Sequence, residues 1–316
     1  MRAVITEQYG SPKVLQITDI PKPTIGENEI LVHVKTVAVT AADSRIRGAR
    51  FPSGFGLVAR LVFGLSKPRN KILGNTYSGN IEQVGKNITE YKLGDEVCGM
   101  TGAKMGTYIE YLKVSKFKSI AKKPTSISHR DAVGMLFGGT AALYFVRDKL
   151  GVSKGERVLI NGASGAVGTN AVQLASYFGA EVTGVTRSSN AKLVIGLGAK
   201  QTIDYTKQDV VDIEQKFDVI IDTVGNISPT QAQKLLAKNG RAGLMVAGLG
   251  EMIKARGPIK AGTATEKKQD IEFLLSLIEQ GKLSVVIDKV YPVKDIVKAH
   301  EYVDTGKKVG NVIVEF

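Results

Sequence analysis

The sequence predicts an α/β protein built on a doubly wound parallel sheet, with a β-rich part before it. A glycine-rich turn joins an apolar strand to a helix at residues 157–180, and strand and helix patterns alternate after it. That alternation is typical of a parallel sheet with helices on both faces. Short β-branched runs between turn residues over 1–122 predict the β-rich part.

The glycine-rich turn lies in the segment RVLINGASGAVGTNAVQLASYFGA. RVLIN is typical of a buried parallel strand, and a helical apolar stripe follows the turn. Gly162, Gly165 and Gly168 would let the backbone turn tightly and approach a pyrophosphate, whose charge the start of the helix attracts. A tight turn without a ligand is the alternative. The repeated strand–helix pattern that follows favours dinucleotide binding.

The residues after the second strand, EVTGVT, indicate which dinucleotide is bound. An NAD site usually has an acidic residue there, bonded to the ribose 2′-hydroxyl. This chain has Arg187, Ser188, Ser189 and Asn190, with Lys192 shortly after. An arginine fork and hydroxyl donors suit a 2′-phosphate, so we expect NADPH. A solvated cationic loop remains the alternative.

Composition sets the class of protein. With 316 residues, 43% hydrophobic and 23% charged, the chain is long enough for two cores and ordinary for a soluble globular protein. No apolar run is long enough to span a membrane, and the first residues predict a strand rather than a signal peptide. The single cysteine, Cys98, excludes an intramolecular disulfide and is consistent with a cytoplasmic location.

The net charge of +13 could indicate a nucleic-acid partner. However, the lysines are scattered, and no nucleic-acid-binding motif is present. A basic surface that attracts a polyanionic cofactor explains the charge as well. We therefore do not expect nucleic acid to be the partner, and RNA binding stays a minority alternative.

Expected elements follow the chain in order. Strands are predicted in the β-rich part at 2–7, 15–19, 29–39, 77–84, 96–99 and 107–114, as in a small barrel or sandwich. The apolar and basic segment 51–71 is interpreted as a surface helix covering this barrel; a substrate lid or a partner surface is the alternative. Two helices are predicted at 131–136 and 140–150. The last elements are expected as helix 270–280, strand 285–290, helix 293–303 and strand 311–314.

Several segments in this order resemble the medium-chain dehydrogenase/reductase superfamily, in its zinc-independent quinone oxidoreductase-like branch. They include YGSPKVLQITDIPKP, GNTYSGNIEQVGKNITEYKLGDEV, LFGGTAAL, LGAKQTIDY and AHEYVDTGKKVGNVIVEF. The resemblance implies a GroES-like β-rich catalytic domain plus a Rossmann cofactor domain. It divides the chain into 1–122 (catalytic, first part), 123–265 (Rossmann) and 266–316 (return to the catalytic domain). It also implies a nicotinamide site between the domains and a homodimer.

The resemblance also bears on zinc. Zinc-dependent relatives have Cys near the position of Thr40, a His-Glu pair where this chain has Asn75-Thr76, and a thiol or carboxylate near Leu136. A four-cysteine structural lobe is impossible with one cysteine. The three histidines match no ligand position and are expected at the surface or in packing: His33, His129 and His300. We therefore expect no zinc.

The family chemistry implied is direct hydride transfer from NADPH to quinones or other α,β-unsaturated carbonyl compounds. A proton would follow from water or a hydroxyl. Thr40 resembles the family position that faces the nicotinamide. The tyrosine that some relatives place before a proline is here Phe51-Pro52, so Phe51 is expected to line the substrate pocket. Tyr77 is the substitute candidate for proton delivery, and Asp43 is expected to hold the domain junction.

The cofactor contacts implied by the resemblance form one set that runs from the adenosine to the nicotinamide end. They are Thr140, Gly162, Ser164, Gly165, Ala166, Val167, Gly168, Arg187, Ser188, Lys192, Tyr205, Gly225, Val246 and Asn311. Two alternatives remain for function. One is an enoyl or alkenal reductase, and the other is an NADPH-sensing, RNA-binding relative with little turnover.

Overall fold

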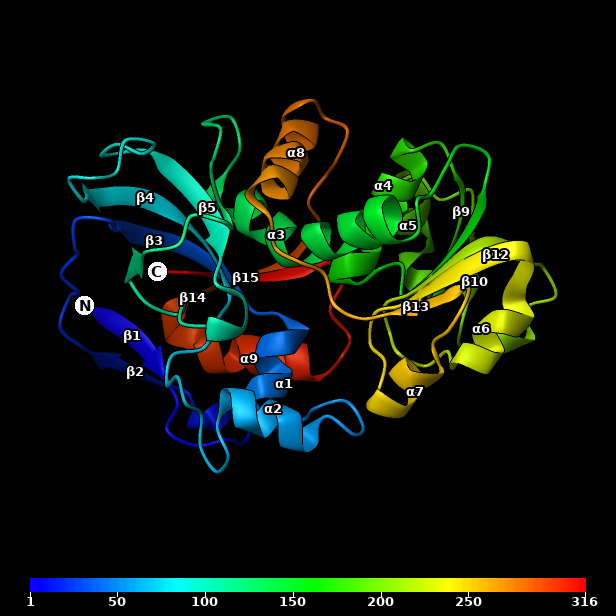
Figure 1. The fold of residues 1–316 in the computed structure, drawn as a ribbon, viewed down its shortest axis with the longest axis horizontal. Coiled ribbons are helices and arrows are strands. Elements are labelled where there is room, and N and C mark those ends of the chain that lie inside the picture. The colour runs from blue at the N-terminus through cyan, green and yellow to red at the C-terminus, as the bar shows by residue number, and fades with distance from the viewer.

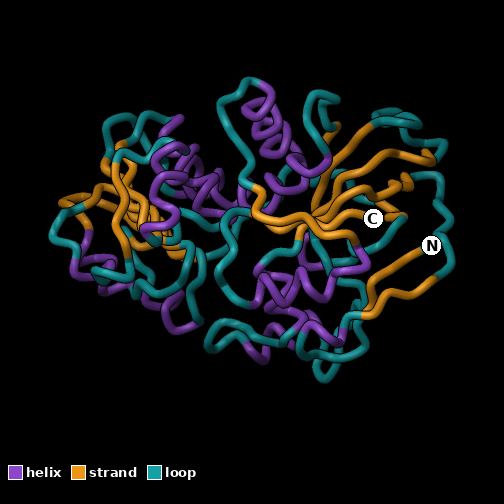
Figure 2. Tube along the Cα trace, turned by 180° about the vertical axis from the view of Figure 1, so that it is seen from behind, coloured by secondary structure: helices purple, strands orange, loops and turns teal.

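The computed structural model describes all 316 residues and contains two large sheets with helices between them. Figure 1 shows the β-rich half on the side of both termini and the parallel sheet on the other side. Seen from behind in Figure 2, the strands gather in two separate groups. No helix has the length and apolar character needed to cross a bilayer.

The parallel sheet has six strands in the order β10-β9-β8-β11-β12-β13, and every neighbouring pair is parallel. The order reverses between β8 and β11, which is where open α/β sheets place their ligands. The strands are β8 Arg157–Asn161, β9 Glu181–Thr186, β10 Gln201–Asp204, β11 Phe217–Asp222, β12 Leu236–Leu244 and β13 Ile259–Ala261. The helices are α4 Ala166–Tyr177, α5 Ala191–Gly196, α6 Pro229–Leu235 and α7 Leu249–Lys254.

The β-rich half contains a seven-stranded sheet in the order β14-β15-β3-β4-β5-β7, with β6 also paired to β3. Its C-terminal strands return to it, because Ile313 on β15 lies opposite Ala38 on β3. The strands are β3 Ile30–Ala38, β4 Thr76–Val84, β5 Glu96–Met100, β6 Tyr111–Val114, β7 Ile120–Lys122, β14 Ile287–Pro292 and β15 Asn311–Glu315. A separate pair is formed by β1 Arg2–Ile5 and β2 Gln16–Asp19.

One long helix connects the halves where the sequence predicts two. α3 spans His129–Leu143 and continues as a π-helical segment, Tyr144–Lys149. The expected break falls at Gly138, which is buried within the helix. A Cβ there would lie 2.2 Å from the carbonyl oxygen of Ala166, so this glycine lets α3 approach the start of α4 closely. Tertiary contact therefore outweighs the low helix propensity of glycine.

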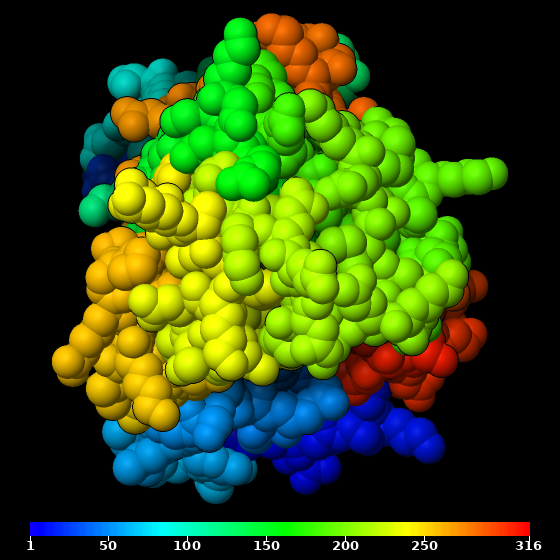
Figure 3. Space-filling view, turned by 90° about the vertical axis from the view of Figure 1, so that its right-hand side faces the viewer, coloured from blue at the N-terminus to red at the C-terminus, as the bar shows by residue number.

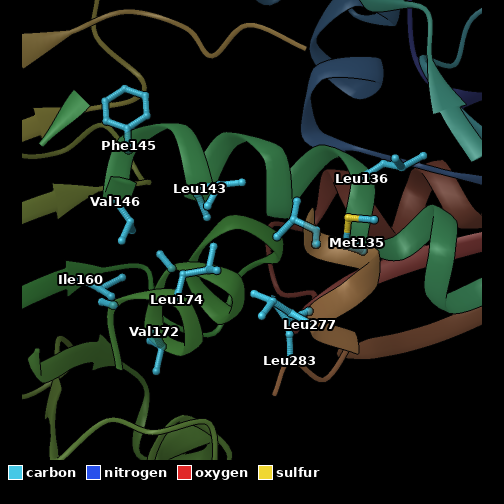
Figure 4. Close-up of a cluster of buried hydrophobic side chains, with 14 of the residues drawn as sticks. Met135, Leu136, Leu143, Phe145, Val146, Ile160, Val172, Leu174, Leu277 and Leu283 are labelled. Atoms are coloured by element: carbon cyan, nitrogen blue, oxygen red, sulfur yellow. The ribbon is translucent and has the colours of Figure 1, made fainter. Parts of the chain in front are cut away.

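The core around α3 joins elements from both ends of the chain. Figure 4 shows Leu143 and Val146 of this helix beside Leu174 on α4, with Leu277 and Leu283 close by. All of these side chains belong to one buried cluster. Leu277 lies on α8, Lys268–Glu279. The C-terminal segment is therefore packed against the helix that leads into the parallel sheet.

Segment 51–71 does not cover the β-rich sheet as expected. Its helix, α2 at Gly56–Phe63, has no buried residue, and the side chains of Leu57 and Leu65 are 69% and 60% exposed. Only the Phe51 and Phe63 rings pack inward, stacked with centroids 6.1 Å apart. The apolar stripe is thus left at the surface.

Two further helices lie near α2 in the lower part of Figure 1: α1, Ala41–Arg47, and α9, Ile296–Asp304. An ion pair of 2.5 Å between Arg47 and Asp304 ties them together. Figure 3 views the parallel-sheet half, in green to yellow, from its outer side, with N-terminal and C-terminal segments below it.

Candidate active site

The glycine turn between β8 and α4 contains three glycines with different environments. Gly162 has a φ of +80°, and a Cβ there would lie 2.6 Å from Thr223 Oγ1. A Cβ on Gly168 would lie 2.0 Å from the Gly162 carbonyl oxygen. A Cβ on Gly165, however, would meet nothing closer than 3.4 Å. The fold requires the first and third glycines, whereas the second leaves open space above the helix.

The start of α4 supplies unpaired donors to that space. Gly165 is the N-cap, and Ala166, Val167 and Gly168 form the first turn. The N–H groups of a first helical turn have no acceptor within the helix, and the helix dipole favours an anion there. The arrangement is therefore a cradle for a phosphate group, with the open Gly165 at its centre.

The strand ends beside the cradle are held by a polar network that the sequence analysis missed. Asn161 Nδ2 donates to Asp222 Oδ1 at 2.9 Å and to Asn226 Oδ1 at 2.6 Å. The buried Asp222 carboxylate also accepts from the backbone N–H groups of Val224 and Gly225, at 2.9 and 3.1 Å. The loop after β11 is fixed in this way. The sequence signal for this network was a polar residue at the end of each of two apolar strands: Asn161 on β8 and Asp222 on β11.

Ser164 is fixed from two sides. Its hydroxyl oxygen accepts from Thr186 Oγ1 at 2.9 Å, and its carbonyl oxygen accepts from the Gly310 N–H at 2.8 Å. Gly310 also forms a bridge with Gly165, so the C-terminal segment lies against the cradle. The neighbouring Asn311 directs its amide to the Val286 carbonyl oxygen at 3.0 Å. Asn311 therefore shapes the edge of the cradle, and its amide donor is already used.

The predicted 2′-phosphate residues partly come together at the end of β9. Arg187 Nε donates to the Tyr205 hydroxyl at 2.6 Å, and its guanidinium lies 5.7 Å from the ring centroid. Both side chains are exposed, as is Lys192 on α5. Lys192 has no polar partner within hydrogen-bond distance. An arginine that is held through Nε and keeps its NH₂ groups free is suited to a phosphate.

The residues after β9 contain no carboxylate, but a carboxylate from the neighbouring strand reaches this position. The Ser188 N–H donates to Asp204 Oδ2 at 3.0 Å, and the Ser188 hydroxyl bonds the same oxygen. Hydrogen bonds from Ser188 and Thr206 hold the pKa of the Asp204 carboxyl far below its usual range. Asp204 ends β10, the neighbour of β9, and the sequence spacing around β9 alone does not reveal this approach. The donors of Ser188 are thus occupied by an anion of the protein.

A cleft of about 580 Å³ lies where the two halves meet. Phe51 and Pro52 line it from the β-rich half, and Gly225 and Val246 line it from the carboxyl edge of the parallel sheet. The backbone N–H of Leu249 donates to the Ser53 carbonyl oxygen at 2.8 Å across this junction. The structure therefore brings the expected pocket residue Phe51 together with Gly225 and Val246, two of the expected cofactor contacts. The remaining lining residues are Arg45, Arg50, Ser53, Gly248, Gly250, Glu251 and Lys254.

Three other predicted residues do not line this cleft. Thr40 caps α1, and its hydroxyl donates to Asp43 Oδ2 at 2.6 Å in a capping box. Tyr77 is 1% exposed in the core of the β-rich half, which is why its phenol pKa is raised well above the ordinary value. Thr140 is buried on α3 and donates to the Leu136 carbonyl oxygen at 2.7 Å. Burial removes Tyr77 as a proton donor to a substrate in the cleft.

The histidines lie in separate environments. His33 stacks on Tyr111 with centroids 4.7 Å apart, and His129 Nδ1 lies 2.8 Å from the Ser78 hydroxyl. His300 is fully buried, and neither ring nitrogen has a hydrogen-bond partner. No three His, Cys, Asp or Glu side chains come close enough to hold a metal ion.

Comparison with protein-family models gives two matches in chain order. The model of the alcohol dehydrogenase GroES-like domain matches residues 26–149, and the model of zinc-binding dehydrogenases matches residues 197–314. The chain belongs to the medium-chain dehydrogenase/reductase superfamily. The β-rich sheet is its GroES-like part, and the parallel sheet is its Rossmann part.

Relatives within the superfamily cover nearly the whole chain. The chain is 29% identical to the 2-methylene-furan-3-one reductase of Solanum lycopersicum, over 99% of this chain and 79% of that protein. It is also 29% identical to the chloroplastic NADPH-dependent alkenal/one oxidoreductase of Arabidopsis thaliana, with the same two shares. The solved quinone oxidoreductase from Coxiella burnetii superimposes with a TM-score of 0.89 at 27% identity, covering 100% of this chain and 99% of that one.

Proposed function

We propose that this chain is an NADPH-dependent reductase that transfers hydride to quinones or other α,β-unsaturated carbonyl compounds. The observation that carries the proposal is the continuity between the phosphate cradle and the cleft. The cradle at Gly165 and the cleft residues Gly225 and Val246 follow one edge of the parallel sheet, and Phe51 faces this edge. The named relatives reduce enones, alkenals or quinones, which supports this acceptor class.

The residues present suit a dinucleotide. The open space at Gly165 is what a pyrophosphate needs, and a Cβ would intrude on it. Arg187, held by its hydrogen bond to the Tyr205 hydroxyl, would bind the 2′-phosphate through its free NH₂ groups. The Asp204 carboxylate, bonded to Ser188, would repel that phosphate, so the attraction from Arg187 must exceed this repulsion. When bound, NADPH supplies the hydride.

The chain's own residues position and shield the acceptor. Phe51 gives the cleft an apolar wall against which a planar quinone or enone can lie. The Asp222 network keeps the backbone at Gly225 in place, so the floor of the cleft is preformed. The hydroxyl of Thr40 is committed to Asp43, and Tyr77 is buried. We therefore assign the proton that follows the hydride to water from the cleft mouth.

The side chains at the metal-ligand positions of zinc-dependent relatives support a zinc-independent reaction. They are Thr40, Asn75, Thr76 and Leu136, none of which is a thiolate, imidazole or carboxylate. An acceptor that is already electrophilic needs no Lewis acid, since a conjugated carbonyl delocalises the incoming charge. Metal analysis of the purified protein tests this part. A stoichiometric, tightly bound zinc ion would contradict it.

We also propose a cytoplasmic homodimer. The superfamily resemblance supports the dimer, and strand β13 lies at an edge of the parallel sheet, where a second copy could pair. The single cysteine, Cys98, is consistent with the cytoplasm. Light scattering during size-exclusion chromatography measures the mass directly. A monomer at micromolar concentration would reject the dimer.

The first experiment is calorimetric titration of the protein with NADPH and with NADH, followed by an absorbance assay of NADPH oxidation with quinones and enones. We expect tighter NADPH binding and acceptor-dependent oxidation. Tight binding without oxidation of any acceptor would favour an NADPH-sensing role. Binding of neither dinucleotide would reject the cradle as a cofactor site.

A further inference from the structure

The cleft contains more positive charge than its own carboxylates neutralise. Arg45, Arg50 and Lys254 line it, and Glu251 is the one acidic lining residue. Glu251 is already used, because its carboxylate accepts from the Gly248 N–H at 2.8 Å and so caps α7. The cations come from both halves of the molecule and converge where they meet.

Arg45 is the unusual member of this cluster. It is partly buried, yet its guanidinium forms no ion pair and no hydrogen bond to another residue. Burial, and then the charge of Arg50, lowers the pKa of Arg45 below its ordinary value. An arginine rarely stays desolvated without an acceptor, because its five donors match a carboxylate or phosphate.

The ion pair of Arg50 does not neutralise the excess positive charge of the cleft. It bonds Asp304 at 2.8 Å, but Asp304 also accepts from Arg47 at 2.5 Å. One carboxylate is therefore shared between two arginines. Lys254 is exposed at the end of α7 and forms no ion pair. The cluster therefore carries positive charge that no carboxylate neutralises, in the cleft that Phe51 also lines.

We propose that Arg45, with Arg50 and Lys254, binds an anionic group, a carboxylate or a phosphate, carried by the substrate at a distance from its reducible double bond. This inference rests on the proposed function, because it specifies the substrate class of the same cleft. The cofactor's own phosphates have other partners, at the α4 cradle and at Arg187. Phe51, in the same cleft, provides the apolar wall for the conjugated part of the substrate. The cluster would thus orient the substrate by its charged end.

Two substrate pairs test the proposal and separate the two anions. The carboxylate pair is 4-(3-oxobut-1-enyl)benzoate and its methyl ester, in which the aromatic ring separates the charged group from the reducible double bond. The phosphate pair is crotonyl-coenzyme A and the crotonyl thioester of N-acetylcysteamine. The measured quantity is the ratio of kcat/KM for the charged member to that for the neutral member. We expect wild-type protein to prefer one charged member at least about tenfold, as one charge-assisted pair allows.

Single-residue variants test which side chains cause the preference for the charged substrate. Arg45→Gln should lower the charged-to-neutral ratio about tenfold or more, and Arg45→Lys should restore part of it. Lys254→Gln should lower the ratio by a smaller factor, because its ammonium is more solvated. Lys116→Gln, an exposed lysine on the loop after β6, is the matched control and should leave the ratio unchanged. The dissociation constant of NADPH should not change in any variant.

A binding measurement keeps this proposal separate from the proposed function. Calorimetry of the NADP⁺-bound protein with 4-(3-oxobutyl)benzoate, the saturated product, needs no turnover and should show weaker binding after Arg45→Gln. An unchanged kcat/KM ratio in Arg45→Gln would overturn the proposal, as would equal losses for charged and neutral substrates. A loss of NADPH affinity in that variant would reassign the cluster to the cofactor. Absence of oxidation with every acceptor, combined with arginine-dependent product binding, would reject the reductase function alone.

Discussion

Gly165→Ala separates the cofactor role of the glycine turn from its role in the fold. A Cβ at Gly165 would meet nothing closer than 3.4 Å, and its φ of −78° suits alanine. Loss of a favourable N-cap residue and the lower entropy of the unfolded chain act in opposite directions. The free energy of unfolding should therefore change by less than about 1 kcal/mol.

The same methyl group would occupy the space above the first turn of α4. If it displaces two charge-assisted hydrogen bonds from N–H groups to the pyrophosphate, each of about 1.5–3 kcal/mol, NADPH binding weakens by about 3–6 kcal/mol. That loss is at least about 100-fold in the dissociation constant. NADH should lose as much, since both dinucleotides share the pyrophosphate.

The assay combines urea unfolding of the cofactor-free protein with calorimetric titration of both dinucleotides. Gly168→Ala is the contrasting variant, because its Cβ would lie 2.0 Å from the Gly162 carbonyl oxygen. It should destabilise the protein itself by about 1–3 kcal/mol, as overpacked interiors do. Gly165→Ala protein that binds NADPH within about threefold of wild type would refute the cradle.

Three further substitutions are informative. Arg187→Ala should weaken NADPH by about 1.5–3 kcal/mol and leave NADH nearly unchanged in the same titration; equal losses would remove the phosphate role. Asp204→Asn should tighten NADPH binding severalfold at low salt, because an opposing charge beside Ser188 is lost; unchanged or weaker NADPH binding would show that Asp204 does not oppose the phosphate. Burial lowers the pKa of His300 to about 3, so below about pH 6.5 the unfolded chain takes up a proton that the folded chain does not. The free energy of unfolding therefore decreases as pH falls. In urea titrations, the decrease between pH 7 and pH 5 should be about 2 kcal/mol smaller for His300→Phe than for wild type; an identical decrease in both proteins would contradict a buried, neutral His300.

The sequence was most informative where local pattern and tertiary structure agree. Strand and helix alternation predicted the parallel sheet, because both periodicities are local properties of the chain. The position of the glycine turn followed for the same reason. The return of the C-terminal strands to the β-rich half came only through the family resemblance, since no local signal pairs Ile313 with Ala38.

Residues that act through tertiary contacts were misjudged. Gly138 lies in the expected break between two helices, but it is inside one helix, where its missing side chain allows the contact with α4. Asp204 was overlooked because it reaches Ser188 from the neighbouring strand. The Arg45 cluster likewise depends on two halves meeting, and neither half carries a motif for it.

The pairing of β15 with β3 also constrains how the protein is made. Ile313 and Ala38, which face each other, are 275 residues apart (313 − 38). At about 5–20 residues per second, a ribosome needs about 14–55 seconds to join them. During this interval residues 36–38 of β3 lack the partner that β15 provides, although β6 can already pair with residues 30–33 on the same edge. An unpaired stretch of strand edge is a template for other chains. The Rossmann half can complete its sheet earlier, because β8–β13 are synthesised consecutively. A high rate of initiation therefore raises the number of nascent chains in which residues 36–38 are unpaired at the same time, so a lower rate of initiation should improve the yield of folded protein.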